Sequence, residues 1–372
     1  MLSLNPSLKW VAQFPSERWL NLSGIINLPF FGINKDKTFM PTVADTNELD
    51  KSKYKIVKKD VFVFSGMQTG RDVCIRLALY EKEDTILVSP AYTTFVVKDR
   101  SMILPEYLFI QFNRFQMDRY GWFLSDGSIR SNLDWNVFCD ILIPLPDLET
   151  QQELVDTYNG LKALAEQNEA LIKPLTEACQ AYIVDCKKKY PEVELGGYIE
   201  EYDKRNYDKK IKAVKSVSVT KEFKETNAKV NKYELADYKI VPPRHLSYVQ
   251  TTKNEKCFAN ALNTTNETYV VTQVNKVICS KDESVLNIGF LHLIFRSEEF
   301  DRYAIFNSWG SARETFDWNE LCRVRIPLPP PEVQQAIVNI YNCAEEAKKI
   351  AAEARELMKT LCPALVQRAK NG

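Results

Sequence analysis

The chain has little of the residue chemistry on which metal sites depend. Only two of its 372 residues are histidines, and its nine cysteines include no Cys-x-x-Cys pair. Zinc sites are usually built from such closely spaced ligands, so the sequence argues against a metal centre. No run of about 18 apolar residues occurs, and the N-terminus shows no basic segment followed by an apolar core. We therefore expect a cytoplasmic protein with reduced thiols.

Catalytic motifs are also missing. The sequence contains no Asn-Pro-Pro-Tyr or Asp-Pro-Pro-Tyr methyltransferase motif and no Gly-x-x-x-x-Gly-Lys-Ser/Thr nucleotide loop. The glycine-containing stretch at residues 65–70 is too generic to predict phosphate binding. Neither His245 nor His292 lies beside an evident nucleophile or carboxylate pair, which favours structural roles for both. We expect no catalytic residue and no cofactor.

An excess of charge of one sign is the third absence. Lys+Arg and Asp+Glu are both 49, so the overall balance does not indicate nucleic-acid binding, and any DNA-binding surface must be local. Basic residues outnumber acidic ones at residues 187–189 and 204–224. Such runs are also typical of solvated helix ends and loops.

What the sequence does contain is an internal repeat. Residues 118–159 align with residues 301–342 at a constant offset of 183 and without a gap, with 22 identities in 42 positions. A weaker similarity places residues 54–57 against 238–241 at an offset of 184. The chain is thus a duplicated domain with about 185 residues in each copy, and duplication implies pseudo-twofold symmetry. Divergence is concentrated in the first part of each copy.

The repeated residues include a segment that ends a globular module. In the first copy they include Asp118, Arg119, Tyr120, Gly127, Ser128, Arg130, Asp134, Trp135, Asn136, Cys139, Glu149, Gln151, Gln152, Tyr158, Asn159 and the Ile-Pro-Leu-Pro segment at 143–146. Proline lacks a backbone donor and restricts the residue before it, so this segment cannot lie inside a helix. Glu149 and Glu332 follow it near the starts of two long helical patterns, where acidic side chains suit the positive helix end.

The upstream part of each copy is predicted to form short strands. Runs of β-branched or aromatic residues, bounded by polar turns, occupy residues 60–64, 85–89, 94–97, 269–272 and 276–279. Residues 65–70 are expected to be a loop whose glycines permit tight turns. Residues 104–115 and 286–300 are expected to be helices that pack on the sheets.

Two long helices are predicted downstream of the repeated segments, because apolar residues recur there at alternating steps of three and four, as in a coiled-coil seam. The first seam consists of Leu154, Tyr158, Leu161, Ala165, Ile172, Leu175, Cys179, Tyr182 and Cys186, with Asn168 at its polar position, and the second of Ile340, Ala344, Ala347, Ala351, Ala354, Met358, Leu361 and Leu365. Pro174 is expected to kink or interrupt the first helix. Each segment, if helical, extends on the order of 55 to 60 Å. Ordinary core helices of a helical domain are the alternative interpretation.

The sequence therefore predicts an α+β fold. We expect two β-rich mixed domains separated by two long antiparallel coiled-coil helices, related by a pseudo-twofold internal repeat. The expected boundaries are 1–146 for the first β-rich domain, 147–190 for the central helix, 191–329 for the second β-rich domain and 330–372 for the C-terminal helix.

Together these features resemble the specificity subunits of type I restriction-modification systems. The resemblance rests on residues 127–130, 133–136 and 143–152, and on their second copies at 310–313 and 326–335. In that family a target-recognition domain is followed by a helical spacer, and the pair occurs twice. The resemblance covers both junctions and both helices, and the recognition domains in outline. The chain is somewhat short for the family, and the second module has the Lys-Ile-Val-Pro-Pro-Arg segment at 239–244 where the first has residues 54–64 followed by a glycine loop.

The resemblance implies a non-catalytic subunit that recognises DNA. Each target-recognition domain would read one half of a bipartite site, and the spacer helices would fix the unread gap between the halves, as half-site spacing does in dimeric DNA-binding proteins. The implied partners are double-stranded DNA, two methyltransferase (modification) subunits that dock symmetrically on the helices, and restriction subunits that join afterwards. Catalysis would reside in those partners.

Polar and basic loop residues are the candidates for DNA contact, because arginine suits guanine edges or phosphates and glutamine suits adenine edges. The candidates are Gln68, Thr69, Arg71, Ser128 and Arg130 in the first module, and Thr251, Lys253, Ser311 and Arg313 in the second. Because Arg130 and Arg313 recur, they are expected to touch phosphate or to brace the fold through ion pairs with Asp134 and Asp317. A solvated turn is the alternative for Gln68 and Thr69.

Two other functions fit parts of the pattern. A duplicated scaffold protein, with helices that bind partners and β-rich modules that bind protein or carbohydrate, would share the coiled-coil seams but would need no basic loop residues at matched places. An enzyme that acts alone would need a catalytic constellation, which the sequence does not contain.

Overall fold

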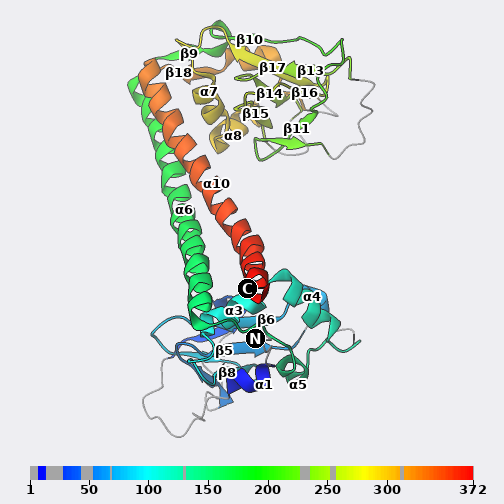
Figure 1. The fold of residues 1–372 in the computed structure, drawn as a ribbon. Helices are drawn as coiled ribbons and strands as arrows, with labels where there is room; N and C mark the ends of the chain where they lie inside the picture. Colours follow the sequence, from blue (N-terminus) through cyan, green and yellow to red (C-terminus); the bar gives the residue numbers. More distant parts are fainter. Residues whose placement is uncertain are drawn as a thin grey trace. The chain divides into compact units, whose positions relative to one another are not determined.

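The computed structural model describes residues 7–13, 28–42, 53–67, 69–128, 131–226, 235–251, 257–310 and 314–371. Contacts divide the chain into two compact units, one of Met1–Asn168 with Lys349–Gly372 and one of Glu169–Lys348. Each unit holds one β-rich domain and half of each of two long helices, α6 (Leu148–Lys189) and α10 (Pro331–Asn371). Head 1 denotes the part of the first unit before α6, and head 2 the part of the second unit between α6 and α10 (Figure 1). The predicted α+β class is confirmed.

Two four-stranded sheets form the described part of head 1. The order β1-β8-β5-β6 is antiparallel throughout, whereas in the order β3-β2-β7-β4 the β2–β7 pair is parallel. The strands are β1 Ala12–Gln13, β2 Phe30–Ile33, β3 Phe39–Pro41, β4 Lys55–Val57, β5 Phe62–Ser65, β6 Arg76–Leu79, β7 Ile86–Val88 and β8 Thr93–Val97. All residues of β5 and β7 are buried, which is why these strands read as continuous apolar runs in the sequence.

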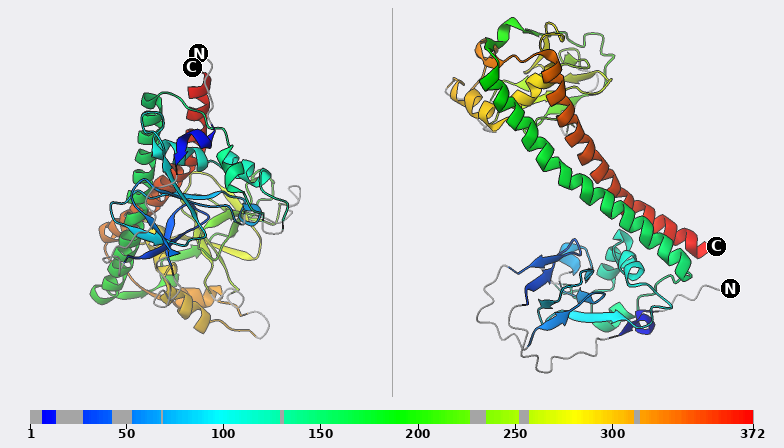
Figure 2. Two further views of the ribbon diagram at one scale, coloured as in Figure 1. Left: turned by 90° about the horizontal axis from the view of Figure 1, so that it is seen from below. Right: turned by 90° about the vertical axis from the view of Figure 1, so that its left-hand side faces the viewer.

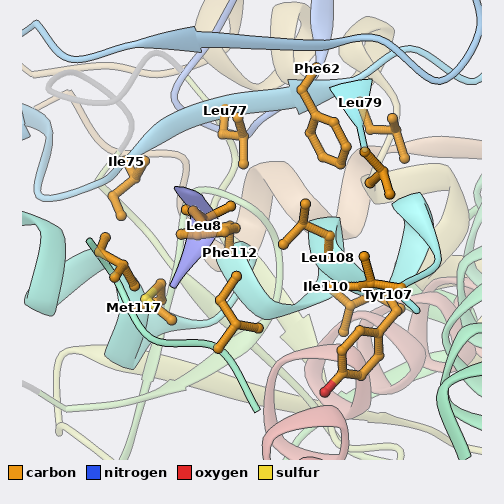
Figure 3. Packing of buried hydrophobic residues seen from close by; sticks show 14 of the residues in the cluster. Leu8, Phe62, Ile75, Leu77, Leu79, Tyr107, Leu108, Ile110, Phe112 and Met117 are labelled. Atoms are coloured by element: carbon orange, nitrogen blue, oxygen red, sulfur yellow. The ribbon is translucent and has the colours of Figure 1, made fainter. Parts of the chain in front are cut away.

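Alternate side chains of β5 and β6 enter two different cores, as the two-residue period of a strand requires. Phe62, Leu77 and Leu79 pack against helix α3 (Pro105–Phe112), as Figure 3 shows. Val63 and Ala78 instead join a second cluster with residues of the other sheet. Because each fully buried apolar side chain contributes roughly 1.5 to 3 kcal/mol, the two clusters fix the register of this sheet.

Head 2 repeats this architecture. Its sheet has the order β10-β17-β14-β15, and its ladders β13–β16 and β11–β12 correspond to β4–β7 and β2–β3. A parallel bridge between Val214 and Val270 takes the place of the parallel β2–β7 pair. The strands are β9 Glu192–Glu194, β10 Ile199–Glu201, β11 Lys215–Val217, β12 Phe223–Glu225, β13 Lys239–Val241, β14 Leu246–Val249, β15 Asn260–Leu262, β16 Tyr269–Val271, β17 Asn275–Ser280 and β18 Arg325–Pro327. The duplication therefore extends into the divergent upstream parts of both copies.

Residues 242–244 differ from the first copy in sequence but not in backbone, whereas residues 239–241 repeat the Lys-Ile-Val of residues 55–57. Strand β13 pairs with β16 in the register in which β4 pairs with β7. Arg244, after the two prolines, has a φ of 59°, and Asp60 at the equivalent turn has a φ of 66°. The two heads therefore share the backbone of this turn.

Each head carries two helices where the sequence predicts one. In head 1, α3 ends at Phe112 and α4 spans Phe115–Phe123; in head 2, α7 spans Ile288–Phe295 and α8 spans Glu298–Phe306. The helix predicted at residues 104–115 corresponds to α3, whereas the helix predicted at residues 286–300 runs across the break between α7 and α8. Ser297 caps α8 by accepting a hydrogen bond from the Phe300 amide at 3.1 Å.

Short helices complete both heads. They are α1 (Leu8–Val11), α2 (Thr69–Asp72) and α5 (Trp135–Cys139) in head 1, and the 3-10 helix η2 (Leu195–Gly197) and α9 (Trp318–Arg323) in head 2. The recurring Asp134 and Asp317 are N-caps, because they accept hydrogen bonds from the amides of Asn136 (2.7 Å) and Glu320 (2.9 Å). Their recurrence thus has a structural cause within their own helices.

Recurring glutamines attach the long helices to the heads. The buried Gln151 accepts a hydrogen bond from the Leu104 amide (2.9 Å) and donates to the carbonyls of Met102 (2.9 Å) and Pro146 (2.8 Å). Gln334 makes the three corresponding hydrogen bonds in the second unit, at 2.8 to 2.9 Å. Each glutamine therefore joins the start of a long helix to the segment that begins α3 or α7.

The predicted seam forms within each unit, where α6 and α10 lie side by side (Figures 1 and 2). Ala344, Ala347, Ala351 and Ala354 of α10 and Ala165 of α6 are all buried. In the second unit the Cys179 thiol contacts the Ile337 carbonyl at 3.7 Å, and in the first unit Met358 packs on the head 1 core. The side chains of Leu361 and Leu365 lie outside the described residues.

Two details of the first seam differ from the prediction. Tyr182 is 51% exposed, and its neighbour Ile183 is buried instead. Helix α6 also runs without interruption past Pro174, although proline removes the amide that would bond the carbonyl four residues earlier. Asn168, at the polar position, donates to the Leu164 carbonyl of its own helix at 2.8 Å.

Candidate nucleic-acid interface

A loop between β5 and β6 is the centre of the candidate interface in head 1. It is held at both ends by the repeated segment downstream. At its start the Leu133 amide donates to the Gly66 carbonyl at 2.8 Å, and at its end the Ile75 amide donates to Asp118 Oδ1 at 2.9 Å. The loop from Gly66 to Ile75 therefore lies in a fixed frame that other parts of the head supply.

Head 2 holds the equivalent loop, between β14 and β15, in the same frame. The Phe316 amide donates to the Gln250 carbonyl at 2.8 Å, and the Phe258 amide donates to Asp301 Oδ1 at 2.8 Å. The loop from Gln250 to Phe258 is one residue shorter than its counterpart, and this difference accounts for the change of repeat offset from 184 to 183. The two heads thus hold loops of different sequence and length in equivalent frames.

A buried ion pair lies under the end of each loop. Lys37 Nζ contacts Asp118 Oδ1 at 2.7 Å, and Lys221 Nζ contacts Asp301 Oδ1 at 2.8 Å. Both lysines are at most 6% exposed, and both have a left-handed backbone, with φ of 60° and 62°. Burial lowers the pKa of both lysines, although their aspartates oppose this shift. Burial likewise raises the pKa of Asp118, against the lowering effect of Lys37.

The two glycines of the first loop allow a close approach of the downstream segment. A Cβ atom on Gly66 would lie 2.1 Å from the Leu133 carbonyl oxygen, and one on Gly70 would lie 2.4 Å from Ser131 Oγ. Neither glycine has a positive φ, so their role is steric. The tight turn that the sequence suggested is instead a close packing of two loops.

Among the predicted contact residues, Thr69 is completely buried. Its hydroxyl donates to the Ser131 carbonyl at 2.9 Å and lies 2.6 Å from Ser125 Oγ. Its amide also donates to the Ser131 carbonyl, at 3.0 Å. The side chain thus joins the loop to residues 125–131, and this arrangement supports a positioning role for Thr69.

Ser128 and Arg71 lie at the surface near this loop. Asp126 Oδ1 accepts hydrogen bonds from the Ser128 hydroxyl (2.6 Å) and from the Asn132 amide (2.8 Å), and these bonds lower the pKa of Asp126. Arg71 is 65% exposed and its Nε contacts Asp72 Oδ1 at 3.0 Å. The structure therefore brings Arg71 and Ser128 into neighbouring loops of one head, as the sequence analysis expected.

In head 2, Thr251 directly follows the frame at Gln250. It forms an antiparallel bridge with Thr315, which in turn bridges Trp309. The amide and carbonyl of Trp309 bond those of Thr315 at 3.2 and 2.9 Å. The five other predicted contact residues, Gln68, Arg130, Lys253, Ser311 and Arg313, lie outside the described residues.

Exposed aromatic and apolar side chains near the loops were not among the predicted contacts. Met67 is 47% exposed, and Trp122 is 49% exposed beside Gly70. In head 2 the ring of Trp309 is 62% exposed. A comparison of the two copies could have indicated them, because Trp122 and Trp309 both lie within the repeated segment but do not align with each other.

Groups suited to other chemistry are not found here. Within the described ranges no group of three His, Cys, Asp or Glu side chains could hold a metal ion. None of the helices described in the structure has both the length and the apolar character to cross a membrane.

Known structures share this fold. The S subunit of a type I restriction-modification system from M. genitalium matches with a TM-score of 0.60 at 10% identity, over 98% of this chain and 94% of that chain. The chain has the fold of a type I specificity subunit. The S-subunit fold that the sequence resemblance implied is thereby confirmed, although neither a family model nor a curated protein matches the chain.

Two further solved chains resemble this specificity-subunit fold at lower scores. One comes from a study of complex assembly and conformational transition of the type I R-M system (TM-score 0.42, 15% identity, 92% of this chain and 91% of that chain). The other is the HsdS subunit from Thermoanaerobacter tengcongensis (TM-score 0.35, 18% identity, 86% and 82%).

Proposed function

We propose that the chain is the DNA-recognition subunit of a type I restriction-modification complex. Head 1 and head 2 each read one half of a bipartite site, and the chain directs partner adenine methyltransferase subunits, and restriction subunits where present, to that site. The chain itself is not an enzyme, and catalysis resides in these partners. It acts in the cytoplasm.

One observation carries the proposal. Two loops of different sequence are anchored in the same frame, with equivalent hydrogen bonds at the start and at the end of each loop. Two domains that read different half-sites need the same backbone anchors but different loop residues. The shared anchors place each loop on DNA, and the loop residues select the bases. The fold shared with the M. genitalium S subunit supports the same function.

Within this proposal the loop residues have distinct parts. Arg71 and Gln68 in head 1, and Lys253 in head 2, contact DNA from the loops, and Arg130 and Arg313 contact phosphates from the repeated segment. Ser128, Ser311 and Thr251 lie beside them, and Thr69 positions the first loop. Four parts of the chain then serve two functions: residues 1–146 and 191–329 read DNA, and residues 147–190 and 330–372 space the readers and bind the methyltransferase subunits.

Methylome sequencing tests the proposal directly. A host with the gene should carry methylated adenines within one split motif, and deletion of the gene should remove methylation from that motif alone. Gel-shift with random duplex DNA, in the presence and absence of a methyltransferase subunit, separates a DNA reader from a scaffold. An unchanged methylome together with no DNA shift would refute the proposal.

A further inference from the structure

Residues shared by the two halves of the chain fall into two groups. Several identical pairs have structural explanations: Asp118 and Asp301 hold the loop ends, and Gln151 and Gln334 attach the helices. A second group lies at the surface. Phe123 ends α4 and its equivalent Phe306 ends α8, and their side chains are 80% and 87% exposed. The packing of the heads does not explain why this pair is shared.

Each of these phenylalanines belongs to a small exposed face of its helix. The arginine and tyrosine that lie four and three residues earlier are also identical in both halves and exposed, and such spacings share one helix face. In α4 the rings of Tyr120 and Phe123 stack, with centroids 6.5 Å apart and planes 14° apart. In α8 the Tyr303 ring instead contacts Phe300 and Phe316, with centroids 6.0 and 6.3 Å apart. Each head therefore carries the same arginine, tyrosine and phenylalanine on one exposed helix face, termed here the aromatic face.

An identical surface on two heads indicates one ligand that binds twice. The loops that are proposed to read DNA differ between the heads, as different half-sites require. A surface that must do the same task in both heads has no reason to differ. The aromatic face therefore fits a partner that is present in two equal copies.

The chemistry of the face indicates a protein partner. On α8 the Glu298 carboxylate is 94% exposed and lies 3.9 Å from Arg302, so it offsets the charge with which this arginine would attract the phosphates of a duplex. Exposed aromatic rings and arginine are instead the side chains that dominate protein interfaces. An apolar ring left in water gains from burial against a partner.

We propose that the aromatic faces of α4 and α8 are docking sites for two copies of the methyltransferase subunit, with Phe123 and Phe306 as the anchors. This inference rests on the proposed function and adds to it a contact on each head. Because Phe123 lies two residues before Ser125, whose hydroxyl is 2.6 Å from that of Thr69, a partner bound there would lie next to the loop that is proposed to contact DNA.

The test uses the full chain and the methyltransferase subunit from the same host, with native mass spectrometry for stoichiometry and titration for affinity. The wild-type chain should bind two copies. F123A and F306A should each weaken the binding of one copy by tenfold or more, and the double variant should weaken both. Because both rings are exposed, the thermal midpoint of each variant should match that of the wild type.

A control lies on another part of head 1. Leu142 is 61% exposed, and its equivalent is Arg325, so it is not shared by the two heads. L142A should bind both copies within twofold of the wild type. If L142A weakens binding as much as F123A does, the selective role of the aromatic face is wrong.

Two further outcomes separate this inference from the proposed function. If the double variant binds two copies as tightly as the wild type, or binds them but loses its affinity for duplex DNA, the docking proposal is overturned and DNA recognition stands. If the wild-type chain binds no methyltransferase subunit at all, the proposed function itself fails.

Discussion

At the scale of single residues, the two buried lysine–aspartate pairs connect three parts of each head. Lys37 donates to the carbonyl of Phe112 at the end of α3, and Lys221 donates to the carbonyl of Phe295 at the end of α7. The aspartate of each pair accepts the amide that closes the candidate DNA-contact loop. Removal of charges from water is costly, so such a pair is stable only when further hydrogen bonds satisfy both partners, as they do here.

Removal of one partner should therefore be more harmful than removal of both charges. Lys37→Met leaves the Asp118 carboxylate buried without its cation and should lower the free energy of unfolding by about 3 to 5 kcal/mol. In the double variant Lys37→Met with Asp118→Asn, the amide oxygen can still accept from Ile75, and most of the loss should be recovered. Urea unfolding of the full chain measures both.

The control for this cycle is an exposed lysine two positions away. Lys35→Met should change the free energy of unfolding by no more than about 0.5 kcal/mol, because surface substitutions outside specific contacts have small effects. A double variant that is less stable than Lys37→Met would show that the pair is not the source of the effect.

His292 provides a pH-dependent prediction. It is buried in α7, its Nε2 atom has no hydrogen-bond partner among the described residues, and burial, together with the nearby Arg296, lowers its pKa from 6.5 to about 3. Between these values the unfolded chain binds a proton that the folded chain does not, so stability is complete above pH 6.5 and falls as the pH decreases.

The equivalent residue of head 1 is Phe109, which suggests the variant His292→Phe. The free energy of unfolding of the wild type should fall relative to this variant by about 1.4 kcal/mol per pH unit below 6.5. Urea unfolding at pH 7, 5.5 and 4.5 measures the difference. Parallel pH dependences of the two chains would contradict the assignment.

Individual contacts were only partly predictable from the sequence. The recurrence of Asp118 as Asp301 was visible, but its lysine partner was not identified, because Lys37 and Lys221 lie outside the gapless alignment and at the other offset, 184. Thr69 was read as a contact residue because a threonine in a glycine-rich loop carries no signal of its own burial. Burial depends on residues 125–131, which are distant in sequence.

At the scale of elements, the seam between α6 and α10 depends on small side chains. Ala351 is 4% exposed, and a larger residue there has no space without moving the helices apart. Ala351→Leu should lower the free energy of unfolding by about 1 to 3 kcal/mol, the usual cost of overpacking. Thermal and urea unfolding of the full chain measure the loss.

The neighbouring alanine is a matched control. Ala352 is exposed on the same turn of α10, so Ala352→Leu adds the same atoms outside the seam. Alanine and leucine have similar helix propensities, and the free energy of unfolding should change by no more than about 0.5 kcal/mol. Equal losses in the two variants would mean that helix propensity, and not the seam, controls the response.

Periodicity predicted the long elements better than the short ones. The three-four spacing located both long helices, and apolar runs located β5, β7 and β8, whereas β6 was not predicted. The breaks between α3 and α4 and between α7 and α8 lie at two polar residues each, Asn113-Arg114 and Arg296-Ser297. They were missed because a polar pair is also typical of the exposed side of a continuous helix. Whether Tyr182 or Ile183 is buried in the seam depends on the packing partner, which the pattern of one helix cannot specify.

At the scale of the whole molecule, each head has cores of its own. The buried clusters of head 1 draw on residues 8–158 and those of head 2 on residues 183–337, and among the residues that the structure describes no buried cluster contains residues of both heads. The sequence repeat predicted this duplication. The equivalent anchoring of the two loops could be recognised only in the structure. Exchange of residues 1–117 for those of a relative should therefore change only one half of the recognised motif.

The equivalent frames permit a sharper exchange within the chain itself. Replacement of residues 67–74 by residues 251–257 places the loop of head 2 between the anchors of head 1, Gly66 and Ile75. If the loops select bases, both halves of the methylated motif should then become the same short sequence, and methylome sequencing of the host reads this out.

The reverse exchange, of residues 251–257 by 67–74, is the matched control and should make both halves equal to the other sequence. Both chimaeras keep Asp118 and Asp301, so the hydrogen bonds that close each loop remain available. If a folded chimaera still methylates the original split motif, base selection lies outside these loops. The frames would then serve only to stabilise the heads, and the readers would have to be sought among residues such as Trp122 and Trp309, which differ between equivalent positions of the two halves.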